Sequence, residues 1–207
     1  MNTNVTIYVE GAADERFVRQ LCRHLWGNEA EELCIIKTNG WTSLNNEKEK
    51  GSFINQMRRR KDDGGCNLVI FDADENCSDR DCQLRHWAEA NDVDLKTFLI
   101  PNHHDSGALE DLLERIINPQ NEPVMSCWHQ YERLLSRVEL PWKKGKPLTI
   151  PAKKTEIYAY LEVLLGKSKS QKELIKDNNR DYTNENHWDL RSKALMPLID
   201  FLSQNLG

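Results

Sequence analysis

Four short apolar segments in the first hundred residues limit the fold more than any other feature of the sequence. They are VTIYV, LCIIK, NLVIFDAD and LKTFLI, at Val5–Val9, Leu33–Lys37, Asn67–Asp74 and Leu95–Ile100. Segments with helical periodicity alternate with them, most clearly at Leu109–Ile117, where leucines and isoleucines recur at intervals of three and four. Strands that alternate with helices predict an α/β fold, with a mostly parallel sheet of about four strands covered by helices.

The strand pattern fades after about residue 118. A connector at Asn118–Pro123 is followed by apolar patterns that predict helices around Trp128–Leu135, Ile157–Leu165 and Leu195–Leu202. The polar segment Lys167–Asn186 is expected to be mostly loop. We therefore predict an α/β domain at residues 1–118 and a helical C-terminal extension, residues 119–207, packed on it.

The composition is typical of a soluble globular protein, with 39% hydrophobic and 29% charged residues. No apolar run approaches the roughly 20 residues needed to span a bilayer, and the N-terminus lacks the pattern of a signal peptide. A cytoplasmic location without a membrane partner is therefore expected. Cys77 and Cys82 have no second Cys/His pair at zinc-site spacing, so reduced thiols are favoured over a zinc site.

Three acidic residues follow the ends of two predicted strands. Glu10 follows the first strand, and Asp72 and Asp74 end the third. Ligands of parallel sheets gather at the carboxyl ends of the strands, and residues two apart in an extended chain point the same way. If these two strands are neighbours, the three carboxylates meet, which favours a bound divalent cation such as Mg²⁺. Alternatively, Glu10-Gly11 is only a turn, and Asp74 is only a helix N-cap.

VEGAADERF at Val9–Phe17 and VIFDADEN at Val69–Asn76 resemble the TOPRIM family of primases, topoisomerases, OLD-type nucleases and small RNA-maturing nucleases. The resemblance implies a Rossmann-like TOPRIM sheet. It also implies an Mg²⁺ site (Mn²⁺ as a substitute) in which Asp72 and Asp74 are metal ligands and Glu10 is a ligand or a general acid or base. The stretches FLIPNHHDSGALEDLL and HWDL are similar to small stand-alone TOPRIM-like bacterial proteins. The clear resemblance covers about the first 117 residues.

The chain departs from the family pattern after the two aspartates, where ENCSDRDC replaces the glycine that many members have. No topoisomerase tyrosine domain, zinc ribbon or G-x-x-x-x-G-K-[ST] motif is present in the 207 residues. A full primase, topoisomerase or OLD nuclease is therefore excluded, and a small nuclease-like module remains.

Further candidates lie near the same predicted edge. Glu110 is either a fourth metal ligand or an acid favoured by the helix dipole, and Asp14 is either a supporting group or a helix-start acid. His103 and His104 are proton-shuttle candidates, although exposed loop histidines are common.

Basic residues form clusters, although the net charge is −5: one at Met57–Lys61, one at Lys143, Lys144 and Lys146, and one at Lys153–Lys154. That charge argues against a protein whose whole surface binds nucleic acid, but not against a local basic groove. Lys153 and Lys154 are our candidates for nucleic-acid binding, in a Lys143–Lys154 stretch that contains Trp142. A charged surface loop is the alternative.

The function predicted from these observations is Mg²⁺-dependent nuclease or nucleotidyl-transfer chemistry on a nucleic acid or nucleotide. The main alternative is a non-catalytic TOPRIM-like module that binds a protein or nucleic-acid partner. A response-regulator-like or phosphatase-like domain that uses Asp72 as acceptor or nucleophile is a third interpretation.

Overall fold

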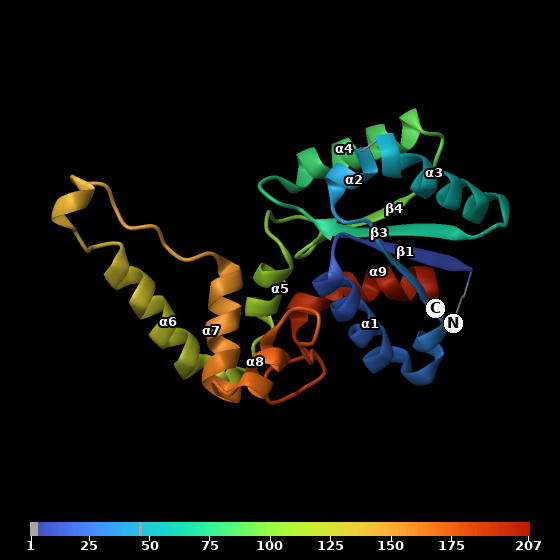
Figure 1. The fold of residues 1–207 in the computed structure, drawn as a ribbon. Helices are drawn as coiled ribbons and strands as arrows, with labels where there is room; N and C mark the ends of the chain where they lie inside the picture. The colour runs from blue at the N-terminus through green and yellow to red at the C-terminus, as the bar shows by residue number, and fades with distance from the viewer. Residues whose placement is uncertain (1–3, 46) are drawn as a thin grey trace. The chain divides into compact units, whose positions relative to one another are not determined.

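The computed structural model describes residues 4–45 and 47–207 and contains a four-stranded, all-parallel sheet (Figure 1). Its strands are β1 (Val5–Val9), β2 (Cys34–Lys37), β3 (Cys66–Asp72) and β4 (Lys96–Ile100), in the order β2-β1-β3-β4. The sheet and its flanking helices confirm the predicted α/β fold. Because β1 and β3 are neighbours, their carboxyl ends lie side by side.

Helices cover both faces of this sheet. In Figure 1, α2 (Trp41–Asn45), α3 (Glu47–Asp62) and α4 (Cys77–Ala90) lie on one face, and α1 (Ala12–Trp26) and α9 (Met196–Leu206) lie on the other. Alternate residues of each strand point to opposite faces, so each face has its own buried set. The set packed with α3 and α4 includes Tyr8, Val69, Phe71 and Leu99. Both faces of the sheet are therefore buried, which explains why its strands read as almost continuous apolar runs.

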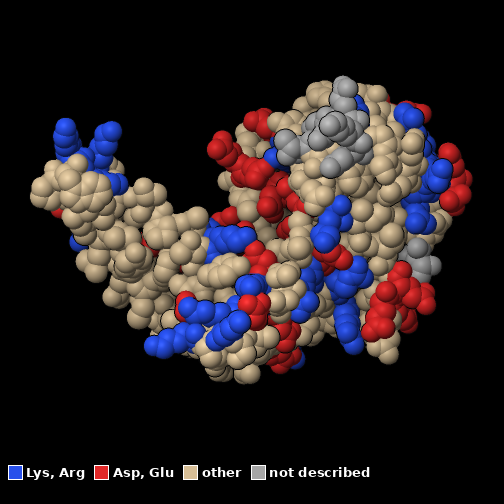
Figure 2. Space-filling view, viewed as in Figure 1, with Lys and Arg blue, Asp and Glu red and all other residues tan. Residues whose placement is uncertain are grey.

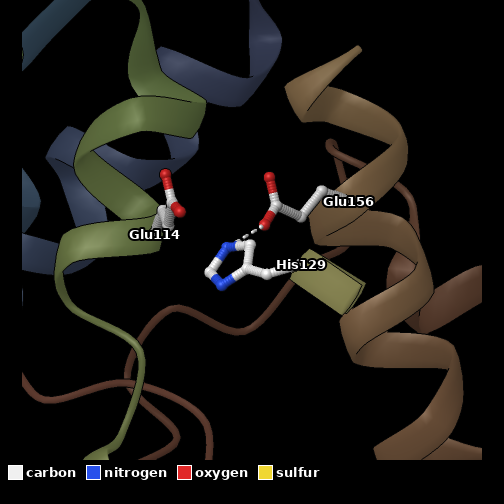
Figure 3. A group of neighbouring side chains, drawn as sticks. All are labelled: Glu114, His129 and Glu156. Atoms are coloured by element: carbon white, nitrogen blue, oxygen red, sulfur yellow. Dashed lines mark ion pairs between the residues drawn. The ribbon is translucent and has the colours of Figure 1, made fainter. Parts of the chain in front are cut away.

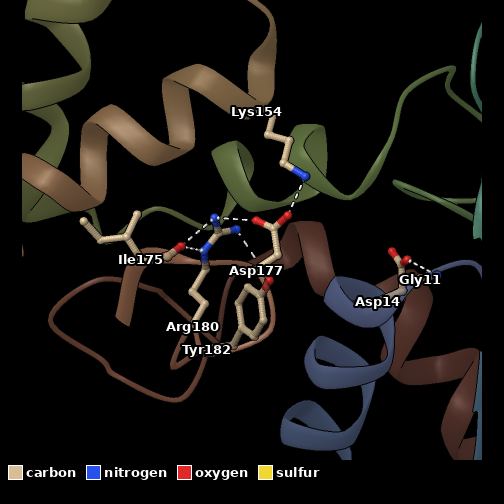
Figure 4. Close-up of polar contacts among 7 residues, drawn as sticks. All are labelled: Gly11, Asp14, Lys154, Ile175, Asp177, Arg180 and Tyr182. Atoms are coloured by element: carbon tan, nitrogen blue, oxygen red, sulfur yellow. Dashed lines mark hydrogen bonds and ion pairs between the residues drawn. The ribbon is translucent and has the colours of Figure 1, made fainter. Parts of the chain in front are cut away.

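The start of α1 shows how the turn after β1 is fixed. Gly11 is the N-cap of the helix, and its N–H donates to Asp14 Oδ2 at 2.8 Å (Figure 4). A carboxylate in the first turn satisfies a backbone donor that has no partner within the helix, and the helix dipole favours it. The turn therefore holds Glu10 between the end of β1 and the start of α1.

The chain forms two compact units, one of residues 1–116 and 190–207 and the other of residues 117–189. The first unit also contains the 3-10 helices η1 (Gly27–Glu32) and η4 (Lys193–Leu195) and the short helix α5 (Leu109–Arg115). The last helix, α9, thus belongs to the unit that contains the sheet, whereas the sequence analysis grouped it with the extension. As a division into folding domains, the boundary at residue 118 stays a prediction.

The second unit contains α6 (Glu122–Leu135), α7 (Lys153–Leu165) and α8 (Lys169–Ile175), with 3-10 helices η2 (Pro119–Asn121) and η3 (Pro141–Lys143). Helix α8 occupies a minor part of the segment Lys167–Asn186, and the rest of that segment is loop, so the segment is mostly loop as predicted. A capping box explains the helix: Ser168 N–H donates to Gln171 Oε1 at 3.0 Å, and Gln171 N–H donates to Ser168 Oγ at 3.3 Å.

An aromatic and arginine cluster forms the core of the second unit. Trp188 is 1% exposed, and its indole N–H donates to the Asp181 carbonyl at 3.0 Å. The buried Arg180 donates to the Ile175 carbonyl and to Asp177, and its guanidinium lies near the Tyr182 ring (Figure 4). A buried charge is tolerated because acceptors surround it.

No helix within the described residues is long and apolar enough to cross a membrane.

Candidate metal centre

Glu10 and Asp72 meet at the carboxyl edge of the sheet. Val9 is paired with Ile70 in the β1–β3 ladder, so Glu10, the residue after β1, lies beside the last residues of β3. The backbone N–H of Asp72 donates to Glu10 Oε1 at 3.2 Å. Asp72 Oδ1 in turn accepts a hydrogen bond from the Leu109 N–H at 3.0 Å, at the start of α5. These contacts join two strand ends and one helix around a pair of carboxylates.

Asp74 reaches the same edge by a different backbone route from the one expected. The predicted strand extended to Asp74, but β3 ends at Asp72, and Asp74 has a left-handed φ of 51°. Its backbone forms a short antiparallel bridge with Gly107, with N–O distances of 2.9 and 2.8 Å. The simple alternation of an extended chain therefore does not orient this side chain.

Asp74 is also not the N-cap of the following helix. That role belongs to Asn76, whose Oδ1 accepts from the Asp79 N–H at 3.1 Å. The Asp74 carboxylate instead forms an ion pair with Arg80 of α4. The Arg80 side chain is only 14% exposed, and its guanidinium lies 5.6 Å from the centre of the Trp41 ring. Arg80 was not among the residues that the sequence singled out.

The carboxyl groups at this edge interact strongly with one another. Burial, followed by the charges of Asp14, Glu10, Glu110 and Asp74 in that order, raises the pKa of Asp72 to about 9. Burial and the charges of Asp74 and Asp14 outweigh the Asp72 N–H and Arg80 at Glu10, so that its pKa is raised to about 7. Five acidic groups thus share one partly buried region, where each negative charge disfavours the next.

The carboxylate oxygens do not converge on one point. Within the described residues, no three acids at this edge offer oxygens that all lie within 4.8 Å of one another. Each of the three central carboxylates accepts a hydrogen bond from the protein instead: Glu10 from Asp72 N–H, Asp72 from Leu109 N–H, and Asp74 from Arg80. These hydrogen bonds fix the orientation of the three carboxylates.

A pocket of about 450 Å³ opens beside Asp74. Its wall includes two further acidic residues, Glu75 and Asp79, together with Asn76, Arg80 and Gln83. It leaves room for a ligand next to the acidic group that lies nearest the surface.

The remaining acidic and histidine candidates divide into two kinds. Asp14 and Glu110 lie close enough for their charges to raise the pKa of Asp72. His103 has a structural role, because its Nδ1 accepts from the Leu99 N–H at 3.1 Å and its ring stacks on Phe98. His104 is exposed, and its backbone N–H donates to Asn102 Oδ1.

Lys153 and Lys154 lie at the start of α7, in the second unit, and both are in ion pairs. Lys153 Nζ lies 3.0 Å from Glu156 Oε2, and Lys154 pairs with Asp177 (Figure 4). Glu156 also pairs with His129 at 3.3 Å (Figure 3). Internal carboxylates therefore already neutralise both lysines, and their role in nucleic-acid binding stays a prediction.

Comparison with known proteins gives one match. No curated protein and no solved structure matches the chain. A family model described as a protein of unknown function, DUF3226, matches residues 4–206. Because this match spans almost all of its 207 residues, the chain belongs to the DUF3226 family.

Proposed function

We propose that this protein carries out Mg²⁺-dependent phosphodiester chemistry, of the nuclease or nucleotidyl-transfer type, on a nucleic acid or nucleotide. The observation that carries the proposal is the Glu10–Asp72 contact between adjoining strand ends, with Asp14, Asp74 and Glu110 within electrostatic reach. Together with VEGAADERF and FDAD, it supports a TOPRIM-like site.

The donor set fits a hard divalent cation. Mg²⁺ prefers oxygen ligands and commonly binds one or two carboxylates together with waters and substrate phosphates. Asp72 and Asp74 would be the ligands, with Glu10 and Glu110 as further oxygen donors. Mn²⁺ accepts similar ligands and would substitute. When bound, such an ion would stabilise negative charge on the reacting phosphate.

The protein's own groups have separate roles in this proposal. Glu10 is partly buried and has a pKa raised to about 7, so it can hold or release a proton near neutral pH. The Leu109 N–H fixes the orientation of Asp72. The pocket beside Asp74 provides space for a phosphate group.

One observation favours the alternative, a non-catalytic TOPRIM-like module that binds a protein or nucleic-acid partner. Arg80 pairs with Asp74 and supplies the positive charge that a metal would otherwise supply. A scaffold that no longer binds metal would be stabilised by such an internal pair.

Replacement of Asp72 separates the two functions. Asp72→Asn keeps the size of the side chain and removes its charge, so we expect it to lower Mg²⁺-dependent cleavage of DNA or RNA substrates by roughly a thousandfold or more. Asp63→Asn is the matched control, because it removes the same charge from an exposed residue that precedes β3, away from the carboxyl edge. Equal activity of wild type and Asp72→Asn, or no cleavage by the wild type with any nucleic acid or nucleotide, would contradict the proposal.

A further inference from the structure

A basic stretch begins after the exposed Glu139, in the segment that joins α6 to α7, and runs into the first two residues of α7. Residues 140–154 contain five lysines and no acidic residue. Since the whole chain has a net charge of −5, the remaining residues carry −10. Two of the five lysines, Lys153 and Lys154, are paired at the start of α7. The other three, Lys143, Lys144 and Lys146, lie in the part that we call the 140–150 loop.

Among the described residues, these three lysines have no carboxylate partner. Within the described residues, none of them forms an ion pair, and Lys144 and Lys146 are exposed. Lys144 and Gly145 both have left-handed backbones, with φ of 49° and 78°, and reverse the chain at this point. Figure 2 shows Lys and Arg side chains at the end of the unit that contains α6 and α7. The loop thus presents cations to solvent, with no counterion from the part of the chain that the structure describes.

The loop also exposes an aromatic ring beside these cations. Trp142 is 71% exposed, the highest value among the exposed large hydrophobic residues of the described chain. Lys143 Nζ lies 5.8 Å from the centre of the Trp142 ring. Val138 and Ile150, on either side, are each 39% exposed. No core packing accounts for a tryptophan in this position, and exposed aromatic groups beside cations are a feature of binding surfaces.

We propose that the 140–150 loop binds single-stranded nucleic acid, with its tryptophan stacked on a base and its three lysines on the phosphates. Single strands present unstacked bases to an aromatic ring, whereas a duplex buries them in its stack. The lysines release counterions from the phosphates, which contributes affinity without dependence on sequence. The proposal names the substrate class of the reaction proposed above, and in that respect it rests on the proposed function.

Binding by this loop can be measured without the acidic site. The full-length protein is titrated, in EDTA, into fluorescently labelled single-stranded DNA, single-stranded RNA and a duplex of the same length, with anisotropy as the readout. We expect Trp142→Ala to weaken single-strand binding about tenfold. The triple variant Lys143→Gln/Lys144→Gln/Lys146→Gln should lower the salt dependence, the slope of log K against log salt, by about 2.

A matched control removes the same charge from another part of the same unit. Lys167→Gln/Lys169→Gln/Lys172→Gln replaces three exposed lysines at or near α8 and should bind like the wild type. The inference is overturned if the wild type does not bind, if duplex binds as tightly as single strands, or if the two triple variants lose affinity equally. Competition by polyglutamate at the same charge concentration would overturn it in favour of an acidic protein partner.

The double variant Asp72→Asn/Asp74→Asn distinguishes the two proposals. It should lose cleavage and keep single-strand binding in EDTA. Binding without cleavage in the wild type would leave the loop proposal standing and refute the proposed reaction. Trp142→Ala and the triple variant Lys143→Gln/Lys144→Gln/Lys146→Gln test the loop during cleavage. If both cleave with the KM of the wild type, the loop proposal alone is refuted.

Discussion

The carboxyl edge of the sheet and the 140–150 loop carry opposite charges in opposite settings. At the edge, carboxylates are partly buried, raise each other's pKa and accept hydrogen bonds from the protein. In the loop, lysines are exposed or half-buried and have no ion pair among the described residues. The orientation of the carboxylates at the edge is therefore fixed by contacts with the rest of the fold. The side chains of the loop lysines are not fixed in this way.

This difference predicts a large contrast in stability between two aromatic substitutions. Phe71 is 1% exposed and directly precedes Asp72, so Phe71→Ala should lower the free energy of unfolding by about 3–5 kcal/mol. Trp142→Ala removes a larger but exposed ring and should change it by less than about 0.5 kcal/mol. Urea denaturation of both variants measures the contrast, and similar losses would mean that Trp142 is part of a core.

The acidic edge should also make stability depend on pH. The pKa of Asp72 is 3.8 in an unperturbed side chain, as in the unfolded protein, and about 9 in the fold. Between pH 3.8 and about 9 the folded protein therefore binds more protons than the unfolded chain. The free energy of unfolding should therefore fall as pH rises through this range. Glu10 adds to the fall between pH 4.5 and about 7.

Asp72→Asn provides the control, because an amide does not titrate. It should flatten the fall and stabilise the protein at pH 9 by several kcal/mol, on the order of 1.4 kcal/mol for each unit of the raised pKa, relative to wild type. Thermal unfolding from pH 5 to pH 9 checks this. A wild type that becomes more stable as pH rises across the whole range would contradict the raised pKa values.

Substitution of Arg80 should have a smaller effect, on the affinity of the carboxyl edge for Mg²⁺. Its ion pair with Asp74 competes with any bound cation, so Arg80→Gln should strengthen Mg²⁺ binding a few-fold. Arg85→Gln is the matched control, since Arg85 lies on the same helix and pairs with Asp81 instead. Weaker Mg²⁺ binding in Arg80→Gln would mean that Arg80 positions Asp74 for the metal rather than competing with it.

Much of the fold could be predicted because its strands are buried on both faces. Each apolar run corresponds to a strand, and the acidic residues at two strand ends indicated the edge at which Glu10 and Asp72 meet. The left-handed backbone of Asp74 could not be predicted, because it depends on a bridge to Gly107, which lies 33 residues away.

The ion pairs were harder to predict than the strands. Lys153 and Glu156 lie one helical turn apart, so their pairing follows from local spacing. Asp177, which pairs with Lys154, comes from a separate segment and gives no local pattern. For this reason the sequence directed attention to Lys153 and Lys154, although Lys143, Lys144 and Lys146, which form no ion pair with the described residues, lie a few residues earlier.

The most direct test of the account is calorimetric titration of the wild type and of Asp72→Asn/Asp74→Asn with Mg²⁺ and Mn²⁺. We expect the wild type to bind the ions more tightly at pH 8 than at pH 6, because binding must displace protons from the raised-pKa carboxyls. The double variant should show no binding at either pH. Binding that is equal in the two proteins would contradict the proposed metal centre, and so would a wild type that binds neither ion with or without a single-stranded oligonucleotide.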